Sequence, residues 1–194
     1  MPRGEPFWFG PRRDLFGVLH APDPPESDVA VLLCAPFGSE MMATHRTYRH
    51  VAEHVAANGF CALRFDYDGT GDSAGHDRDG DRVAAWRASV DHACEELKRR
   101  SGATKIVVFG LRLGALLAVQ AASDRDDVDA IVTYGASISG KRWLREVRAF
   151  QRLKVVESEP SSADGEEAVG FALTAETARA LETLDVAKLA PKAK

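Results

Sequence analysis

The sequence predicts an α/β fold with a doubly wound, mostly parallel sheet. Short β-rich runs alternate with amphipathic helical patterns through the first two thirds of the chain, which is typical of strands joined by helical crossovers. The later β-rich runs are almost entirely apolar, as expected for parallel strands buried on both faces. The chain has 194 residues, of which 45% are hydrophobic. It is therefore long enough for one domain with a sizeable core, and general disorder is excluded.

Six strands are expected. The first two, Phe7–Phe9 and Leu15–His20, flank a Gly-Pro-Arg-Arg turn and are predicted to form an antiparallel hairpin at the edge of the sheet. The four strands that follow are expected to be parallel. They are Val29–Leu33, Phe60–Phe65, Lys105–Phe109 and Val128–Tyr134.

Three helices are predicted between these strands, because apolar residues recur at spacings of three and four. They cover Thr44–Asn58, Asp81–Arg100 and Arg112–Ala122, and the last follows its strand with almost no linker. The predicted buried stripe of the first is Tyr48, Val51, Ala52, Val55 and Ala56; that of the second is Val83, Trp86, Val90, Cys94 and Leu97.

The composition changes after Gly140, so we divide the chain into a core, 1–140, and a partial helical cap with a C-terminal helix, 141–194. Lys141–Lys154 is predicted to be a basic amphipathic helix. Glu157–Glu167 is acidic and predicts a mobile loop, and Thr174 is expected to cap a helix that runs to about Leu189. No strand is predicted in this part. The expected apolar side of the basic helix is Trp143, Val147, Phe150 and Leu153.

Composition also excludes several classes of protein. The formal net charge of -4 provides no overall basic field for nucleic acid. The three cysteines, none in C-x-x-C spacing, predict neither a disulfide framework nor a zinc site. The N-terminus lacks the apolar centre of a signal peptide, and the longest strongly apolar run, Val29–Ala35, is too short to span a membrane. We therefore expect a cytoplasmic protein without cofactor, metal or nucleic-acid partner.

The most informative segment for function is Gly110-Leu111-Arg112-Leu113-Gly114, where a strand runs directly into a helix. The spacing matches the nucleophile elbow G-x-S-x-G, whose glycines let strand and helix approach closely around a strained central residue. The central residue here is Arg112, which stays protonated and cannot act as a nucleophile. Taken alone, the pattern fits a plain strand–helix turn equally well.

Two further segments extend the pattern: Cys34–Glu40 (CAPFGSE) and Phe65–Gly75 (FDYDGTGDSAG). With the elbow, they resemble the α/β-hydrolase superfamily, specifically its monoglyceride-lipase and serine-aminopeptidase-like branch and the exosortase-associated hydrolases of bacteria. The resemblance covers roughly residues 7–150. It implies an α/β-hydrolase sheet, strands one to six, and hydrolysis or transfer of an acyl group from an ester, thioester or amide.

The resemblance also assigns roles by position. The backbone N–H groups of Phe37 and Leu113 would form an oxyanion hole, which stabilises the charge of a tetrahedral intermediate. The loop Asp66–Ser73 would border the site, and the basic helix from Lys141 would begin the cap.

The sequence departs from the family pattern at the catalytic positions. Arg112 replaces the serine, Ala35-Pro36 replaces a His-Gly pair, and no histidine follows His92, whereas the family's acid and histidine follow the nucleophile. We expect no serine-hydrolase triad in this chain alone. The family's strands seven and eight are also not found, so Val128–Tyr134 is expected to be an exposed apolar edge. A truncated fragment, a split protein completed by a partner chain, and a compensating dimer all stay open.

Two interpretations of Arg112 are open. A guanidinium at a helix N-terminus can hold a carboxylate, phosphate or acyl-carrier headgroup, which would make the chain a noncatalytic binding or scaffold protein for an anionic or acyl ligand. Alternatively, Arg112 forms a structural ion pair in a site that has lost its chemistry.

Three competing motifs favour structural roles. His50–His54 matches H-x-x-E-H, but both histidines lie off the apolar stripe, so a solvated helix face is preferred to a zinc site. Gly69–Ala74 matches a dinucleotide-binding pattern, but the surrounding aspartates would repel a pyrophosphate. A turn tied by Asp and Ser side chains to its own backbone is the simpler interpretation. Cys34 is expected to be buried and unreactive, and no histidine is placed to activate Ser39.

Overall fold

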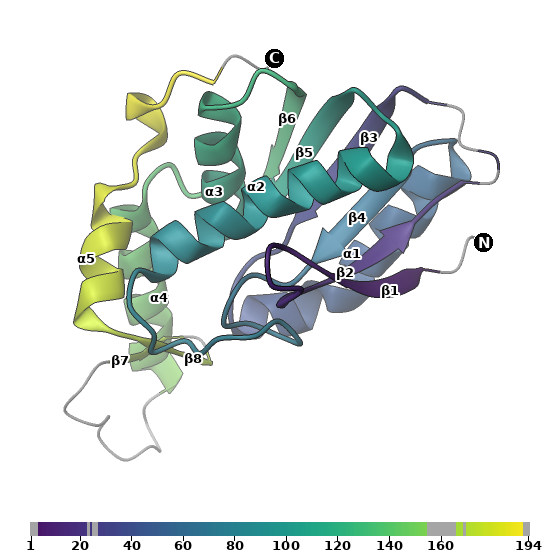
Figure 1. The fold of residues 1–194 in the computed structure, drawn as a ribbon. Helices are drawn as coiled ribbons and strands as arrows, with labels where there is room; N and C mark the ends of the chain where they lie inside the picture. Colours follow the sequence, from purple (N-terminus) through teal and green to yellow (C-terminus); the bar gives the residue numbers. More distant parts are fainter. Residues whose placement is uncertain (1–3, 23, 25–26, 155–165, 169, 192–194) are drawn as a thin grey trace.

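The sheet is mixed and mostly parallel, as predicted. The computed structural model describes residues 4–22, 24, 27–154, 166–168 and 170–191. Within them, one six-stranded sheet has the order β1-β2-β4-β3-β5-β6 (Figure 1). Strands β4, β3, β5 and β6 are parallel to one another, whereas β2 is antiparallel to both β1 and β4. The strands are β1 (Glu5–Phe9), β2 (Leu15–His20), β3 (Val29–Cys34), β4 (Cys61–Phe65), β5 (Lys105–Leu111) and β6 (Val128–Tyr134).

Helices cover both faces of this sheet, which confirms the doubly wound arrangement (Figure 1). Helix α1 (Ser39–Ala57) lies on one face, and α2 (Arg82–Ser101) and α3 (Leu113–Ser123) lie on the other. Helices α4 (Gly140–Lys154) and α5 (Ala175–Thr183) pack side by side at one end of the molecule.

The main core lies between the sheet and the α2–α3 layer. All five residues of the stripe predicted on α2 are buried, and Trp86 is among the largest fully buried side chains. Helix α4 adds Trp143, Leu144 and Val147 to the same core. The prediction for Phe150 was wrong: it is 46% exposed, because α4 turns Leu144 toward the core instead. The side chain of Leu153 lies outside the described residues.

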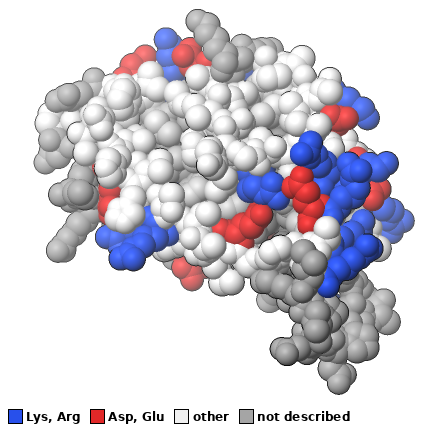
Figure 2. Space-filling model, turned by 180° about the vertical axis from the view of Figure 1, so that it is seen from behind, with Lys and Arg blue, Asp and Glu red and all other residues white. Residues whose placement is uncertain are grey.

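The α1 face is less covered. A small cluster of Leu33, Tyr48, Ala52 and Ala62 lies beneath α1, and β6 forms the edge of the sheet. On the described surface, Val132 and Tyr134 of β6 are 47% and 71% exposed, as the predicted apolar edge requires. Figure 2 is turned by 180° from Figure 1 and shows this α1 side of the molecule. A broad area is free of charged side chains, which gather toward the end where α4 lies.

Two sequence predictions were wrong at element ends. Helix α1 begins at Ser39, before Thr44, because the chain turns at Gly38 with φ 60°. Thr174 does cap α5 by accepting a hydrogen bond from the Thr177 N–H, but the helix ends at Thr183. A separate 3-10 turn, Val186–Lys188, follows it.

The last part of the chain also contains a strand pair that was not predicted. Strands β7 (Glu166–Ala168) and β8 (Phe171–Leu173) form an antiparallel hairpin. Each has three residues, too few for a two-residue alternation to be recognised in the sequence. Most of the predicted acidic loop, residues 157–165, lies outside the described residues.

Candidate functional site

The elbow joins β5 to α3 through a single residue. Arg112 has φ 56° and ψ −121°, a conformation that a residue with a Cβ rarely adopts. The flanking glycines are sterically required. A Cβ on Gly110 would lie 2.4 Å from the Cα of Ala115, and one on Gly114 would lie 2.2 Å from the carbonyl oxygen of Ala35. Strand β5, helix α3 and the segment after β3 are therefore packed so closely that only glycine fits at positions 110 and 114.

The segment after β3 runs beside this elbow. Strands β3 and β5 pair with Cys34 opposite Gly110, so Phe37 follows shortly after the point where β3 meets the elbow strand. The ring of Phe37 is buried and stacks on Tyr67, with 4.6 Å between ring centroids. Leu113 is the first residue of α3, and its N–H has no acceptor within the helix. The two segments that carry the expected oxyanion-hole donors are thus neighbours in the fold.

Two carboxylates hold the guanidinium of Arg112. Its Nε donates to Oε1 of Glu40 at 3.0 Å, and its Nη2 lies 2.9 Å from Oε2 of Glu146. Glu146 also accepts a hydrogen bond from Arg142 at 3.0 Å. The cluster therefore balances two positive against two negative charges and ties the elbow to both α1 and α4. Neither glutamate was identified as an elbow residue from the sequence, because each belongs to a different helix.

These contacts shift the pKa values in the direction expected of stable ion pairs. Burial lowers the pKa of Arg112, but hydrogen bonds and charge interactions with Glu146 and Glu40 outweigh it and raise the pKa. Burial raises the pKa of Glu146, but hydrogen bonds from Arg142 and Arg112 outweigh it, so the pKa lies below its ordinary value. Arg112 and Glu146 therefore stay charged near neutral pH.

A cavity of about 360 Å³ opens at the elbow. No histidine is among the described residues that line it, so Ser39 has no imidazole base within the cavity. The lining residues are Ser39, Glu40, Ala43, Arg112, Glu146, Val147 and Phe150.

The loop after β4 is a turn tied to its own backbone, as predicted. Ser73 Oγ donates to the carbonyl oxygen of Asp66 at 2.7 Å and accepts from the N–H of Phe16 at 3.0 Å. Oδ2 of Asp66 accepts from the N–H of Asp72 at 3.0 Å. These bonds fix the path of the loop toward the neighbouring β2 strand.

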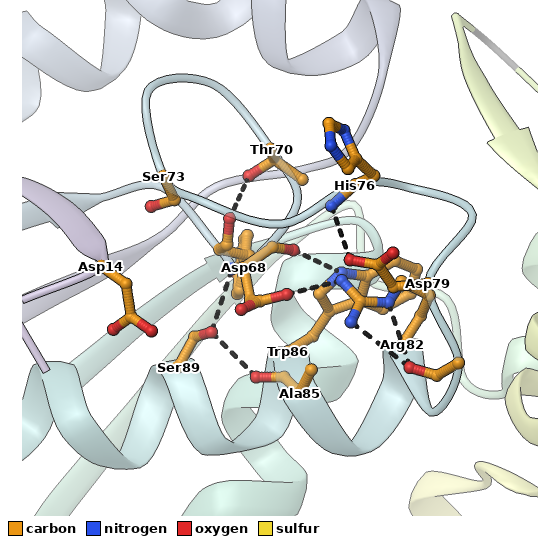
Figure 3. Close-up of polar contacts among 12 residues, drawn as sticks. Asp14, Asp68, Thr70, Ser73, His76, Asp79, Arg82, Ala85, Trp86 and Ser89 are labelled. Atoms are coloured by element: carbon orange, nitrogen blue, oxygen red, sulfur yellow. Dashed lines mark hydrogen bonds and ion pairs between the residues drawn. The ribbon is translucent and has the colours of Figure 1, made fainter. Parts of the chain in front are cut away.

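The same loop carries a buried ion pair (Figure 3). Asp68 points toward Arg82 at the start of α2, with 2.5 Å between Oδ1 and Nη1, and the Arg82 side chain is only 6% exposed. The N–H of Asp68 donates to Ser89 Oγ, and its carbonyl oxygen accepts from Trp86 Nε1. Asp68 is therefore engaged in anchoring the loop to α2. The sequence motif includes Asp68 but gives no sign of its partner on α2.

The remaining candidates lie apart from the elbow cavity. His50 and His54 are exposed on α1, as their position off the apolar stripe predicts. Across the described stretches of the chain, no three His, Cys, Asp or Glu side chains are grouped to hold a metal ion. Cys34 is fully buried, and burial raises the pKa of its thiol. In that same part of the chain, no helix is both long and apolar enough to cross a membrane.

This sheet, with a strained turn between β5 and α3, defines an α/β-hydrolase-fold protein. A family model described as serine aminopeptidase, S33, matches residues 28–165, and the chain belongs to this family. A search of curated proteins finds no match.

Solved structures show the same fold. A hypothetical protein from Pseudomonas aeruginosa has a TM-score of 0.67 at 19% identity, covering 97% of this chain and 73% of that one. An esterase from Pyrococcus furiosus has a TM-score of 0.60 at 20% identity, covering 79% and 60%. A serine hydrolase without a lid from Xanthomonas campestris has a TM-score of 0.55 at 18% identity, covering 68% and 60%. At these identities, the likeness establishes the fold.

Proposed function

We propose that this chain is a noncatalytic member of its family, in which the elbow has become a structural clamp. The observation that carries the proposal is the pair of carboxylates, Glu40 and Glu146, on the guanidinium of Arg112. A guanidinium stays protonated and cannot attack an acyl carbon. Family membership implies the acyl-hydrolase class, whereas these side chains support an elbow that no longer turns over esters by a serine mechanism.

Helix α4 acts in this proposal as a partial cap over the elbow. It contributes Glu146, Val147 and Phe150 to the cavity wall. Because Glu146 pairs with Arg112, α4 is held over the elbow by charge as well as by apolar packing.

The alternative is a binding protein that holds an anionic or acyl ligand at Arg112. Such a ligand competes with Glu40 and Glu146 for the guanidinium, and Glu40 has no other ion-pair partner among the described residues. The clamp is therefore the better-supported role. Benzoate or inorganic phosphate that binds the wild type, and no longer binds Arg112→Ala, would favour the alternative.

The proposal is tested by intact mass after treatment with a fluorophosphonate, with hydrolysis of p-nitrophenyl butyrate measured on the same sample. We expect no adduct and a hydrolysis rate equal to that of buffer. A serine esterase labelled in parallel shows that the reagent is active, and Ser39→Ala is the diagnostic variant. A single stoichiometric adduct on the wild type would overturn the proposal, and its loss in Ser39→Ala would identify the nucleophile.

We also propose that a partner chain or a second copy covers the edge strand β6. The support is the exposure of Val132 and Tyr134 on a strand whose outer backbone groups are available for pairing. Sedimentation of the wild type and of Val132→Lys tests it: a dimer that the lysine dissociates, or a recovered partner that it releases, is expected. The cytoplasmic location stays a prediction, which cell fractionation would test.

A further inference from the structure

A second cavity, of about 420 Å³, lies on the α1 face between the start of α1 and strands β2 and β4. It shares no lining residue with the cavity at the elbow. Its size is at the small end of the range for small-molecule sites. A ligand bound here would therefore be independent of Arg112 and its clamp.

The walls of this cavity are largely apolar. Phe16 and Val18 line it from β2, because alternate residues of that strand face α1 while Leu15 and Leu19 belong to the main core. Met41 and Met42 line it from the first turns of α1, and Met42 is 70% exposed. Methionine side chains adapt readily to an apolar ligand.

One wall carries a guanidinium that makes no ion pair within the described part of the chain. Arg64 lines the cavity and is partly buried, and its Nε lies 3.3 Å from Nε2 of His20. Among the described residues, no carboxylate oxygen lies within ion-pair distance of Arg64, whereas Arg82 has one such partner and Arg112 has two. Burial, followed by the charge of Arg64, lowers the pKa of His20 to about 4, so His20 is neutral and accepts this hydrogen bond. A partly buried charge of this kind is normally paired.

A carboxylate lines the same wall two residues further along the chain. Oδ2 of Asp66 accepts the N–H of Asp72, but Oδ1 accepts no hydrogen bond from the described residues. Asp66 and Arg64 attract each other electrostatically, but no ion pair joins them among the described residues. Burial removes hydration from both charged forms, which raises the pKa of Asp66 and lowers that of Arg64.

We propose that this cavity binds a free α-amino acid with an apolar side chain. Its carboxylate would bond the guanidinium of Arg64, its ammonium would bond Oδ1 of Asp66, and its side chain would lie against Phe16 and Met41. The two charged groups of an α-amino acid share one carbon, so one small ligand presents an acceptor for Arg64 and a donor for Asp66 side by side. A ligand with only one charge would satisfy one of them and be repelled by the other.

Calorimetric titration of the full chain with L-phenylalanine, L-leucine and L-methionine tests the inference. We expect saturable binding with one site per chain. N-acetyl-L-phenylalanine and L-phenylalaninamide, which mimic the two ends of a peptide, are expected to bind about tenfold more weakly or worse, because each lacks one charge-assisted hydrogen bond. Absence of saturable binding for all three amino acids at millimolar concentration would overturn the proposal, as would equal affinity for either analogue.

Two variants locate the site. Arg64→Met and Asp66→Asn are each expected to weaken L-phenylalanine binding by about tenfold or more. The asparagine keeps an oxygen for the Asp72 N–H, so the loop is retained and the charge alone is lost. Arg46→Met is the matched control, because Arg46 is exposed on α1 and does not line the cavity. Unchanged affinity in Asp66→Asn would overturn the assignment even if Arg64→Met fails to fold. Amino-acid binding and the fluorophosphonate result are separate readouts, so either proposal can fail alone.

Discussion

The clamp at the elbow, formed by the ion pairs of Arg112 with Glu40 and Glu146, predicts how far Arg112→Ala lowers the free energy of unfolding. The substitution breaks contacts of 3.0 and 2.9 Å to Glu40 and Glu146, whose side chains are 30% and 35% exposed, against 27% for Arg112. These pairs lie between exposed ion pairs, worth up to about 1 kcal/mol, and buried ones, whose breakage costs roughly 3–5 kcal/mol. We therefore expect the free energy of unfolding to fall by about 2 kcal/mol.

Arg112→Gly separates the clamp from the strain in the backbone. Arg112 adopts φ 56°, a region that costs a residue with a Cβ about 1 kcal/mol or more. Glycine populates this region freely. The glycine variant also lacks the clamp, yet we expect it to be about 1 kcal/mol more stable than the alanine variant.

Urea unfolding with linear extrapolation measures these differences. A double-mutant cycle with Glu146→Gln is expected to show a coupling energy of about 1 kcal/mol with Arg112→Ala. Arg12→Ala is the matched control: its Nε lies 2.8 Å from Asp14, but its side chain is 82% exposed. We expect that variant to change stability by less than about 0.5 kcal/mol. The reasoning is refuted if Arg112→Ala is as stable as the wild type, or if its effect simply adds to that of Glu146→Gln.

Three further predictions follow from the same structure. Gly114→Ala places a Cβ 2.2 Å from the Ala35 carbonyl oxygen and is expected to cost about 1–3 kcal/mol in urea unfolding; no loss would contradict the close approach. Burial raises the pKa of Asp127, but hydrogen bonds from Arg125 and Lys98 outweigh it and leave the pKa at about 2. The stabilisation by the Asp127 carboxylate is complete above the pKa of the unfolded chain and is lost as pH falls toward 2. Asp127→Asn should therefore be less stable than the wild type by about 2 kcal/mol at pH 7. This difference in the free energy of unfolding should narrow below about pH 5, and a difference independent of pH would contradict the reasoning. Arg112→Ser restores G-x-S-x-G but is expected to give no p-nitrophenyl butyrate hydrolysis, because no described residue of the cavity lining is a histidine; measurable turnover would show that a base is in reach.

Local patterns in the sequence were sufficient to predict the six strands of the sheet and the helices between them. The apolar runs of β3 to β6 and the stripe on α2 are properties of consecutive residues, because burial on both faces makes a parallel strand apolar throughout, and burial of one face imposes a period of 3.6 on a helix. Periodicity did not predict β7 and β8, because strands of three residues are too short to show a repeat of two. It also misplaced the start of α1, where a turn at Gly38 rather than an apolar residue begins the helix.

The class of fold and the position of the elbow follow from local sequence, since two glycines around Arg112 already specify a strained turn between a strand and a helix. The role of Arg112 there follows from tertiary contacts, because Glu40 is 72 residues away in the chain and Glu146 belongs to α4. The same holds for the cavity at Arg64 and Asp66, whose apolar walls come from β2 and α1. Secondary structure follows from neighbours along the chain, whereas the pairing of a charge follows from neighbours in space, which this sheet brings together from distant segments.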